Sequence, residues 1–176
     1  YANISFASKP KSMKDKIQQE IREQFGEKLR VRVCGICIEE EKILLVHHRS
    51  LGKNGSLWAP PGGGMHFGED AKSALKREFK EETGCNIDVE EFLFVHEYLD
   101  PPLHGVELFF KVKIVSGTLT LGSDPEMSPD SQLLTEIGFF DLTTLQKQDL
   151  MSLHYVLQNT KSLSGLINQK GYFKFH

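Results

Sequence analysis

Near the start of the chain, apolar side chains recur at every fourth position among charged and polar neighbours. The residues concerned are Met13, Ile17, Ile21 and Phe25. In an α-helix this spacing aligns them in one stripe, so the pattern predicts a helix over residues 13–28. Because the stripe is narrow, we expect this helix to dock on the body of the protein or on a second subunit.

Residues 1–12 show no hydrophobic period of either kind. Met13 would serve as an initiator, so we expect 1–12 to be a disordered leader or a remnant of expression cloning. The remaining residues, 13–176, have the length of one globular domain. We therefore predict a single domain that begins with the N-terminal helix, with a homodimer as the alternative to a monomer.

Two stretches after this helix alternate between apolar and polar positions, which is typical of half-buried strands. They read "LRVRVCGICIE" and "KILLVHH", and the polar residues 39–41 predict a turn between them. Cys34 and Cys37 lie three positions apart on the first strand, so their side chains point to opposite faces. We therefore predict two separate buried thiols, and neither a disulfide nor a shared metal site.

Turn-forming residues then predict a loop over 49–68, followed by a helix over 69–84. The strands expected after it lie at 92–98, 106–115 and 136–142. A last helix before a short tail carries three leucines on one face: Leu150, Leu153 and Leu157. Strands on both sides of a helix indicate a mixed α/β or α+β layered domain.

Charge and composition narrow the choice of partner. The net charge of −3 lacks the basic excess of a nucleic-acid-binding protein, so we expect a small nucleotide and no nucleic acid polymer. No apolar run approaches the roughly 20 residues that span a bilayer, and the N-terminus carries no signal-peptide pattern. We therefore expect a cytoplasmic protein without a membrane partner.

The helix predicted at 69–84 carries three carboxylates within little more than one turn: Glu78, Glu81 and Glu82. At about 100° per residue, they fall on the same side as Ala74 and Leu75. The side expected to face solvent holds Lys72, Ser73, Lys76, Lys80 and Thr83. A run of acids is commonly a solvated helix face, but this arrangement turns the three acids inward.

Three inward carboxylates at this spacing repel one another and lose hydration, which raises their pKa values and weakens the helix. A bound divalent cation removes this conflict. Oxygen ligands without a cluster of His or Cys favour Mg²⁺ or Mn²⁺ over zinc. Because Mg²⁺ held by carboxylates usually completes its shell with waters and phosphates, we expect a phosphate-facing loop nearby.

Three consecutive glycines, Gly62 to Gly64, lie between Pro60-Pro61 and this helix. Glycines let backbone groups approach an oxyanion or a metal closely, and the prolines stiffen the entry to the loop. Neither the P-loop nor the GxGxxG motif fits the sequence here. A triple glycine by itself is more often a flexible turn than a ligand site.

The spacing of these residues resembles the Nudix box, the signature of hydrolases that split nucleoside diphosphates linked to another moiety. Gly63 is followed after five residues by Glu69, and after seven more by "REFKEETG", from Arg77 to Gly84. All fixed polar and glycine positions match, while Phe79 and Cys85 replace aliphatic residues. The flanking segments also resemble strands of this family, so the resemblance covers 31–157 and implies an α/β/α sandwich with a mixed sheet.

The resemblance implies four ligands for Mg²⁺ or Mn²⁺: Gly63 through its carbonyl, Glu78, Glu81 and Glu82. It also implies that Glu69 and Arg77 hold loop and helix in register as part of the catalytic machinery. The metal would neutralise the diphosphate and activate the water that attacks phosphorus. Either Glu78 or Glu126 would act as the general base, because members of this family differ on this point.

The residues expected to contact substrate are Arg49, Gly62, Gly64, His66 and Glu107. For Arg49 and His66 a solvent-exposed side chain is an equal alternative. Glu107 is an isolated acid on an otherwise apolar strand, which suggests the wall of a pocket. Trp58 is interpreted as a packing residue and not as a platform for a base.

Two classes of function remain: a metal-dependent pyrophosphohydrolase, and a non-catalytic module that senses a nucleotide. The three inward acids favour the enzyme. We expect ADP-ribose or a nucleotide sugar as substrate, because the prolines in "YLDPPLHG" would form a stiff wall beside a bulky second moiety. A nucleoside triphosphate, or a dinucleoside polyphosphate given the nearby Tyr98, is the alternative.

Overall fold

The structure, a computed structural model, describes residues 12–125 and 127–174. Of the predicted leader only Ser12 falls in this range, and Glu126 lies outside it. The strands are β1 (Lys28–Glu39), β2 (Lys42–Arg49), β3 (Ser56–Ala59), β4 (Gly62–Gly64), β5 (Cys85–Asp100), β6 (Leu103–Gly117), β7 (Leu134–Phe140) and β8 (Gly171–Phe173). The helices are α1 (Met13–Phe25), α2 (Ala71–Thr83), α3 (Leu142–Leu145), α4 (Tyr155–Gln158) and α5 (Leu163–Ile167), with 3-10 turns at Pro129–Ser131 and Leu150–Ser152.

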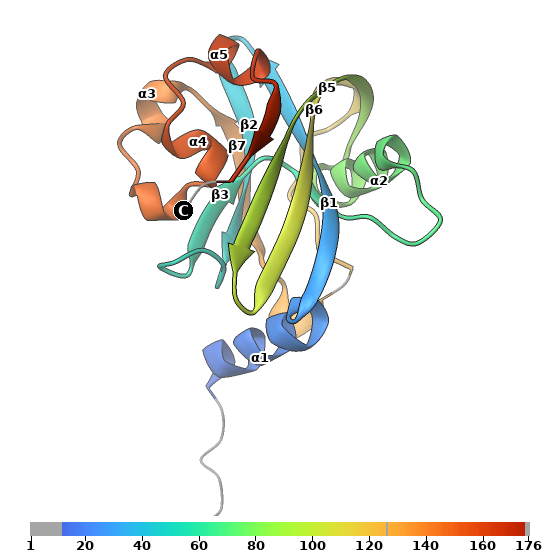
Figure 1. The fold of residues 1–176 in the computed structure, drawn as a ribbon, viewed down its shortest axis with the longest axis vertical. Helices are drawn as coiled ribbons and strands as arrows, with labels where there is room; N and C mark the ends of the chain where they lie inside the picture. Colours follow the sequence, from blue (N-terminus) through green and yellow to red (C-terminus); the bar gives the residue numbers. More distant parts are fainter. Residues whose placement is uncertain (1–11, 126, 175–176) are drawn as a thin grey trace, which may run out of the picture.

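The described strands form one eight-stranded mixed sheet in the order β3-β2-β1-β6-β5-β8, with β4 paired to β1 and β7 paired to β2. The pairs β1–β6 and β5–β8 are parallel, and the others are antiparallel. Helix α2 covers one side of the sheet, and α3, α4 and α5 cover the other (Figure 1). This layering confirms the predicted fold class, an α/β/α sandwich with a mixed sheet.

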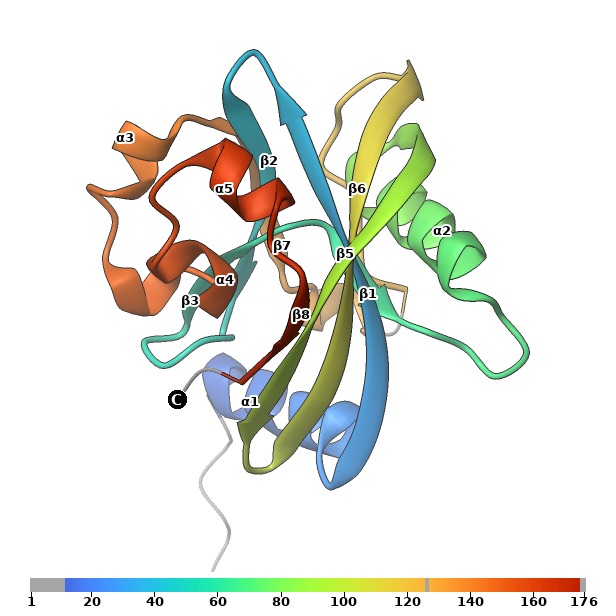
Figure 2. The same cartoon turned by 45° about the horizontal axis from the view of Figure 1, so that its top comes forward.

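Strand β1 runs between the two halves of the sheet, with β2, β3 and β7 on one side and β5 and β6 on the other (Figure 2). Its two faces belong to different parts of the core. Cys34 packs in the apolar cluster beneath α4 and α5, whereas Cys37 packs in the cluster beneath α2. Both thiols are free and buried, so the prediction of two separate thiols is confirmed.

Helix α1 packs on the body of the protein beside the 3-10 turn at Pro129–Ser131. Ile17 and Ile21 are buried against Met127 and Leu133, whereas Met13 is 55% exposed, so the stripe is shorter than predicted. The helix ends before residue 28 because the chain turns at Gly26 into β1. None of the described helices is both long and apolar enough to cross a membrane.

Two parts of the chain differ from the sequence-based expectation. The loop expected at 49–68 contains the short strands β3 and β4. The last predicted helix is broken into the 3-10 turn Leu150–Ser152 and α4, which leaves Leu150 54% exposed while Leu153 is buried. The expected tail adds α5 and the edge strand β8, which extends the sheet beside β5.

Candidate active site

Helix α2 presents the three predicted metal ligands from a well-defined position. Its N-cap is Asp70, whose carboxylate accepts hydrogen bonds from the backbone amides of Lys72 and Ser73 at 3.0 Å. Its C-cap is Gly84, with a left-handed φ of 71°. The helix therefore spans Ala71–Thr83, slightly shorter than the predicted 69–84, with its caps at Asp70 and Gly84.

The buried face of α2 agrees with the prediction except at one residue. Glu78 and Glu82 are buried, and Glu81 is half-buried, so the acids do turn inward. Thr83 was assigned to the solvent face, but it is fully buried. Its hydroxyl donates to the Phe79 carbonyl at 2.6 Å and accepts from the Cys85 amide at 3.1 Å, and these bonds offset the burial of a polar group.

The glycines of β4 allow α2 to lie directly against the sheet. Gly62 and Gly63 pair antiparallel with β1, opposite Cys34 and Val33. A Cβ atom at Gly62 would overlap the Val33 carbonyl, and one at Gly63 would overlap the Glu78 carboxylate. Strand β4 thus brings the Gly63 backbone next to the Glu78 carboxylate.

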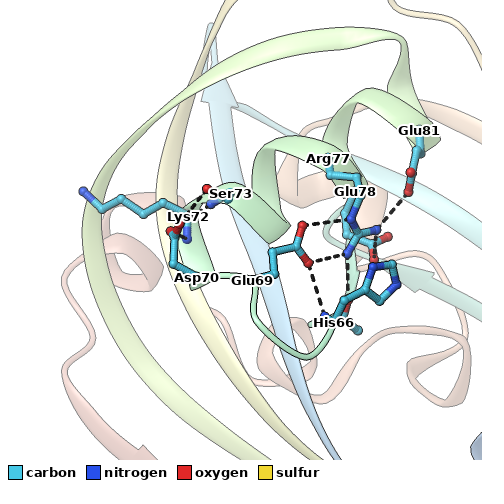
Figure 3. A network of polar contacts seen from close by, with 9 residues as sticks. His66, Glu69, Asp70, Lys72, Ser73, Arg77, Glu78 and Glu81 are labelled. Atoms are coloured by element: carbon cyan, nitrogen blue, oxygen red, sulfur yellow. Dashed lines mark hydrogen bonds and ion pairs between the residues drawn. The ribbon is translucent and has the colours of Figure 1, made fainter.

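Arg77 lies among Glu69, Glu78 and Glu81 (Figure 3). Its guanidinium donates to both oxygens of Glu69 at 3.0 Å and to the carbonyl of Gly64 at 3.0 Å. It also donates to Glu78 at 2.8 Å and to Glu81 at 3.0 Å. Arg77 and Glu69 therefore lie where they can hold the loop and the helix in register, through a bidentate pair.

The acids retain an electrostatic conflict despite Arg77. Burial raises the pKa of Glu78 to about 7, the hydrogen bond from Arg77 opposes this rise, and the charge of Glu82 adds to it. Glu82 accepts from the Gly62 amide at 2.8 Å and lies 3.7 Å from the His48 imidazole. A cation between these carboxylates would relieve their repulsion.

The donor set fits a divalent cation with oxygen ligands. Glu78, Glu81 and Glu82 offer carboxylate oxygens from neighbouring turns of one helix, and Gly63 lies against the Glu78 carboxylate. Hard cations of this type prefer carboxylate and carbonyl oxygens. Burial, and to a smaller extent the charge of Glu82, raises the pKa of Glu78, and a cation bound beside it would favour the ionised carboxylate.

A cavity of about 200 Å³ opens in front of the acids. The predicted substrate residues that line it are Gly62, Gly64, His66 and Glu107. Lys53, Tyr98 and Tyr155 also line it, and the Lys53 ammonium lies 5.6 Å from the centre of the Tyr155 ring. The cavity lining therefore includes aromatic side chains and a lysine in addition to the acids.

Two predicted features lie outside this cavity. Arg49 donates from Nε to the Gln132 carbonyl at 2.7 Å, and it is absent from the described residues that line the cavity. Pro101 and Pro102 line a neighbouring pocket beside α1 instead. Trp58 packs edge-on against Phe140 at 4.7 Å between ring centroids, which agrees with its interpretation as a packing residue.

Glu107 belongs to a buried polar cluster that the sequence did not predict. Its Oε2 atom accepts hydrogen bonds from His96 Nδ1 at 2.7 Å and His154 Nε2 at 3.0 Å, and its Oε1 atom accepts from Arg32 Nε at 3.3 Å. The isolated acid in an apolar strand was the available signal for this cluster. The partners could not be inferred because β1, β5 and the cap of α4 supply them.

The comparison with protein families places this architecture in a known group. A family model described as the NUDIX domain matches residues 28–157. An ADP-ribose pyrophosphatase of Methanocaldococcus jannaschii is 34% identical over 119 residues, which cover 66% of this chain and 64% of that protein. The chain thus matches slightly less than two thirds of that relative's length.

Solved structures share the fold at lower identity. An ADP-ribose pyrophosphatase from Streptococcus suis superposes with a TM-score of 0.55 at 21% identity, and covers 82% of this chain and 98% of its own. A NUDIX hydrolase from Nitrosomonas europaea superposes with a TM-score of 0.60 at 20% identity, over 80% and 86%. With the family match over most of the chain, these findings confirm the resemblance: this chain belongs to the Nudix family.

Proposed function

We propose that this protein hydrolyses the diphosphate linkage of a nucleoside diphosphate joined to a second moiety, with ADP-ribose or a nucleotide sugar as substrate. The observation that carries the proposal is the acid cluster of α2, where burial raises the pKa of Glu78 to about 7 at the mouth of a cavity. The name of the archaeal relative, an ADP-ribose pyrophosphatase, supports the choice of substrate.

Each group of the site has a role in this proposal. Glu78, Glu81 and Glu82, with the Gly63 carbonyl, would hold Mg²⁺ or Mn²⁺. Such an ion would supply charge neutralisation of the diphosphate and a lowered pKa for an attacking water. Arg77 keeps the loop and the acids in place through its bonds to Gly64, Glu69, Glu78 and Glu81.

The reaction transfers one phosphoryl group to water. The water oxygen forms a bond to one phosphorus atom, the anhydride P–O bond breaks, and the second phosphate leaves as the oxyanion. One carboxylate must take the proton of the water, and Glu78 and Glu126 compete for this role. Glu126→Gln distinguishes them, because Glu126 is not among the proposed metal ligands. A large fall in kcat with unchanged Mn²⁺ affinity would assign the base to Glu126, and an unchanged kcat would leave Glu78 in that role.

The lining of the cavity supports a substrate with a second moiety beyond the diphosphate. Lys53, Tyr98 and Tyr155 offer this moiety both aromatic surface and a cation. The argument from a stiff proline wall is weakened, because Pro101 and Pro102 line the neighbouring pocket. The choice of ADP-ribose therefore depends on these lining residues and on the archaeal relative.

A panel of substrates with Mg²⁺ tests the reaction. ADP-ribose, UDP-sugars, dinucleoside polyphosphates and nucleoside triphosphates are compared, with products separated by chromatography. We expect AMP and ribose 5-phosphate from ADP-ribose, at a higher kcat/KM than for any triphosphate. Faster release of pyrophosphate from a triphosphate would contradict ADP-ribose as the substrate and indicate a nucleoside triphosphate. It would not contradict the proposed metal site. Nucleotide binding without turnover would indicate a sensing module.

The metal site is tested with Glu81→Gln and Glu82→Gln. Each change removes one charged ligand, so we expect kcat to fall by about two orders of magnitude or more with the fold retained. Circular dichroism checks the fold, and Lys76→Gln on the exposed face of α2 is the matched control. Near-normal turnover in both glutamine variants would overturn the assignment.

A further inference from the structure

We propose that Glu107 is a positioning residue for the metal site, because it holds Arg32 against the carbonyl of Gly62. This inference depends on the proposed function, since it assigns Glu107 to the support of the same metal site. It replaces the expectation that Glu107 contacts substrate. Three observations support it: the strand register, the three hydrogen bonds that the Glu107 carboxylate accepts, and the hydrogen bonds that lead from Arg32 through Gly62 to Glu82.

Strand register brings the cluster together. Arg32 on β1, Glu107 on β6 and His96 on β5 are direct partners across three neighbouring strands. Side chains of directly paired residues on adjacent strands project from the same face of the sheet, so the three groups lie side by side on that face. His154, the N-cap of α4, closes the cluster from above the sheet.

Protein groups occupy most of the hydrogen-bonding capacity of the Glu107 carboxylate. It is 5% exposed and accepts three hydrogen bonds, two at Oε2 from His96 and His154 and one at Oε1 from Arg32. The Val156 amide lies 3.4 Å from His154 Nδ1, on the side of the ring away from Glu107. With three protein donors already bound, this carboxylate is better suited to hold neighbouring side chains in place than to accept a hydrogen bond from a substrate hydroxyl.

From Arg32 the contacts continue to the metal site. Arg32 Nη2 donates to the Gly62 carbonyl at 3.3 Å, and the Gly62 amide donates to Glu82 at 2.8 Å. Gly62 is thus held by Arg32 at its carbonyl and by Glu82 at its amide. The loss of Glu107 would release Arg32 toward the carboxylates of Glu78 and Glu82, where its charge would compete with a divalent cation.

A metal held by His96, Glu107 and His154 is the competing interpretation, because their ligand atoms lie within 4.8 Å of one another. The spacings of 2.7 and 3.0 Å from one carboxylate oxygen to two imidazole nitrogens are hydrogen-bond lengths. Arg32 also brings a positive charge to the same carboxylate. The cluster is therefore balanced without an ion.

The test measures metal affinity without turnover. Binding of Mn²⁺ is followed by electron paramagnetic resonance for the wild type, Glu107→Gln and Arg32→Lys. We expect both variants to bind Mn²⁺ about 10-fold or more weakly, since changes behind metal ligands typically cost 10–100-fold. The double variant is expected to be no weaker than the weaker single variant, because both changes break the same chain of contacts.

Leu166→Ala is the matched control for a merely structural effect. Leu166 is 1% exposed in the apolar cluster beneath α5 and lies outside the cavity lining, so its loss destabilises the fold without touching Arg32. We expect its Mn²⁺ affinity to equal that of the wild type. A Glu107→Gln variant with wild-type affinity, or with no larger loss than Leu166→Ala, would overturn the positioning role.

Two further outcomes separate this inference from the proposed function. A wild-type protein that binds no Mn²⁺ would contradict the metal site itself, and the positioning role with it. Zn²⁺ that stays bound to the wild type and is lost in His154→Asn, with Mn²⁺ binding intact, would mean that the cluster holds a metal. That result would also overturn the positioning role.

Discussion

Gly63 shows how one residue joins the sheet to the acidic helix. Its α-carbon lies so close to the Glu78 carboxylate that no larger residue fits without displacing it. The strand partner of Gly63 is Val33, which is fully buried, so the strand cannot move away easily. A Cβ atom must therefore push Glu78 out of the cluster.

We expect Gly63→Ala to lower Mn²⁺ affinity and turnover by at least about 10-fold, because a displaced ligand no longer shares the ion with Glu82. Titration with Mn²⁺ and initial rates measure the two effects. Gly138→Ala on β7 is the control, since a Cβ atom there meets its neighbours no closer than 3.4 Å. Wild-type affinity in Gly63→Ala would show that Glu78 is not held by this contact.

The inward orientation of the acids could be predicted, because in a helix the spacing of residues in the sequence determines which of them lie on the same face. Glu78 and Glu82 differ by four positions and are both buried. The partners of Glu107 could not be predicted in this way. Arg32 and His154 are separated from it by 75 and 47 positions, so their contacts depend on strand pairing and on the path of the chain into α4.

At the scale of elements, α1 lies outside the residues matched by the family model but packs beside the segment that follows β6. Glu20 accepts hydrogen bonds from the amide and the hydroxyl of Ser128, at 2.7 and 3.0 Å. Gln18 donates to the Ser50 carbonyl at 2.7 Å. The helix therefore ties together two loops near one end of the cavity.

We expect Ile21→Ala to lower the free energy of unfolding by about 2–4 kcal/mol, because Ile21 is buried in the small apolar cluster under α1. Met13→Ala on the same stripe is the control, with an expected change near zero, because Met13 is 55% exposed. Urea denaturation measures both. Equal losses in the two variants would contradict the observed docking of the helix.

The elements that were missed share one physical cause. Strand β4 has three residues, all glycine, and exists only because β1 offers it hydrogen bonds. Strand β8 likewise exists because it pairs with β5. The final helix was predicted from leucine spacing, but His154 caps a new helix in the middle of that segment and turns its imidazole to Glu107. Whether such short strands and helices form depends on the residues they contact elsewhere in the fold.

At the scale of the whole molecule, the Glu107 cluster links three strands to α4 and makes stability depend on pH. Burial raises the pKa of Glu107, but the charge and hydrogen bond of His154, with His96 and Arg32, outweigh burial and hold it well below its usual 4.5. A carboxyl group with a lowered pKa stabilises the fold above its unfolded pKa. This stabilisation is lost as the pH falls through the folded value.

We therefore expect the free energy of unfolding of the wild type to decrease as the pH falls below about 4.5. Glu107→Gln has no carboxylate to protonate at this position. Over that pH range its free energy of unfolding should therefore fall less than that of the wild type. Urea denaturation at a series of pH values gives both curves. Parallel curves for the two proteins would show that the pKa of Glu107 is not lowered in the fold.

Metal binding is the second property of the whole molecule that the acid cluster predicts. The carboxylates of α2 converge with Gly63 only in the folded chain, so a divalent cation should bind the folded state and stabilise it. At 100 times its Kd an ion adds about 2.7 kcal/mol. For a domain of this length each kcal/mol raises Tm by about 2–4 °C, so millimolar Mg²⁺ should raise it by several degrees.

The control must separate binding from the screening of charge, because salt alone weakens the repulsion between Glu78 and Glu82. Melting curves are therefore compared in MgCl₂ and in NaCl of equal ionic strength, for the wild type and for Glu82→Gln. We expect Mg²⁺ to raise the Tm of the wild type more than NaCl does, and this excess to shrink in Glu82→Gln. An equal rise in both salts would mean that the acids are only screened, and that no specific cation site exists on α2.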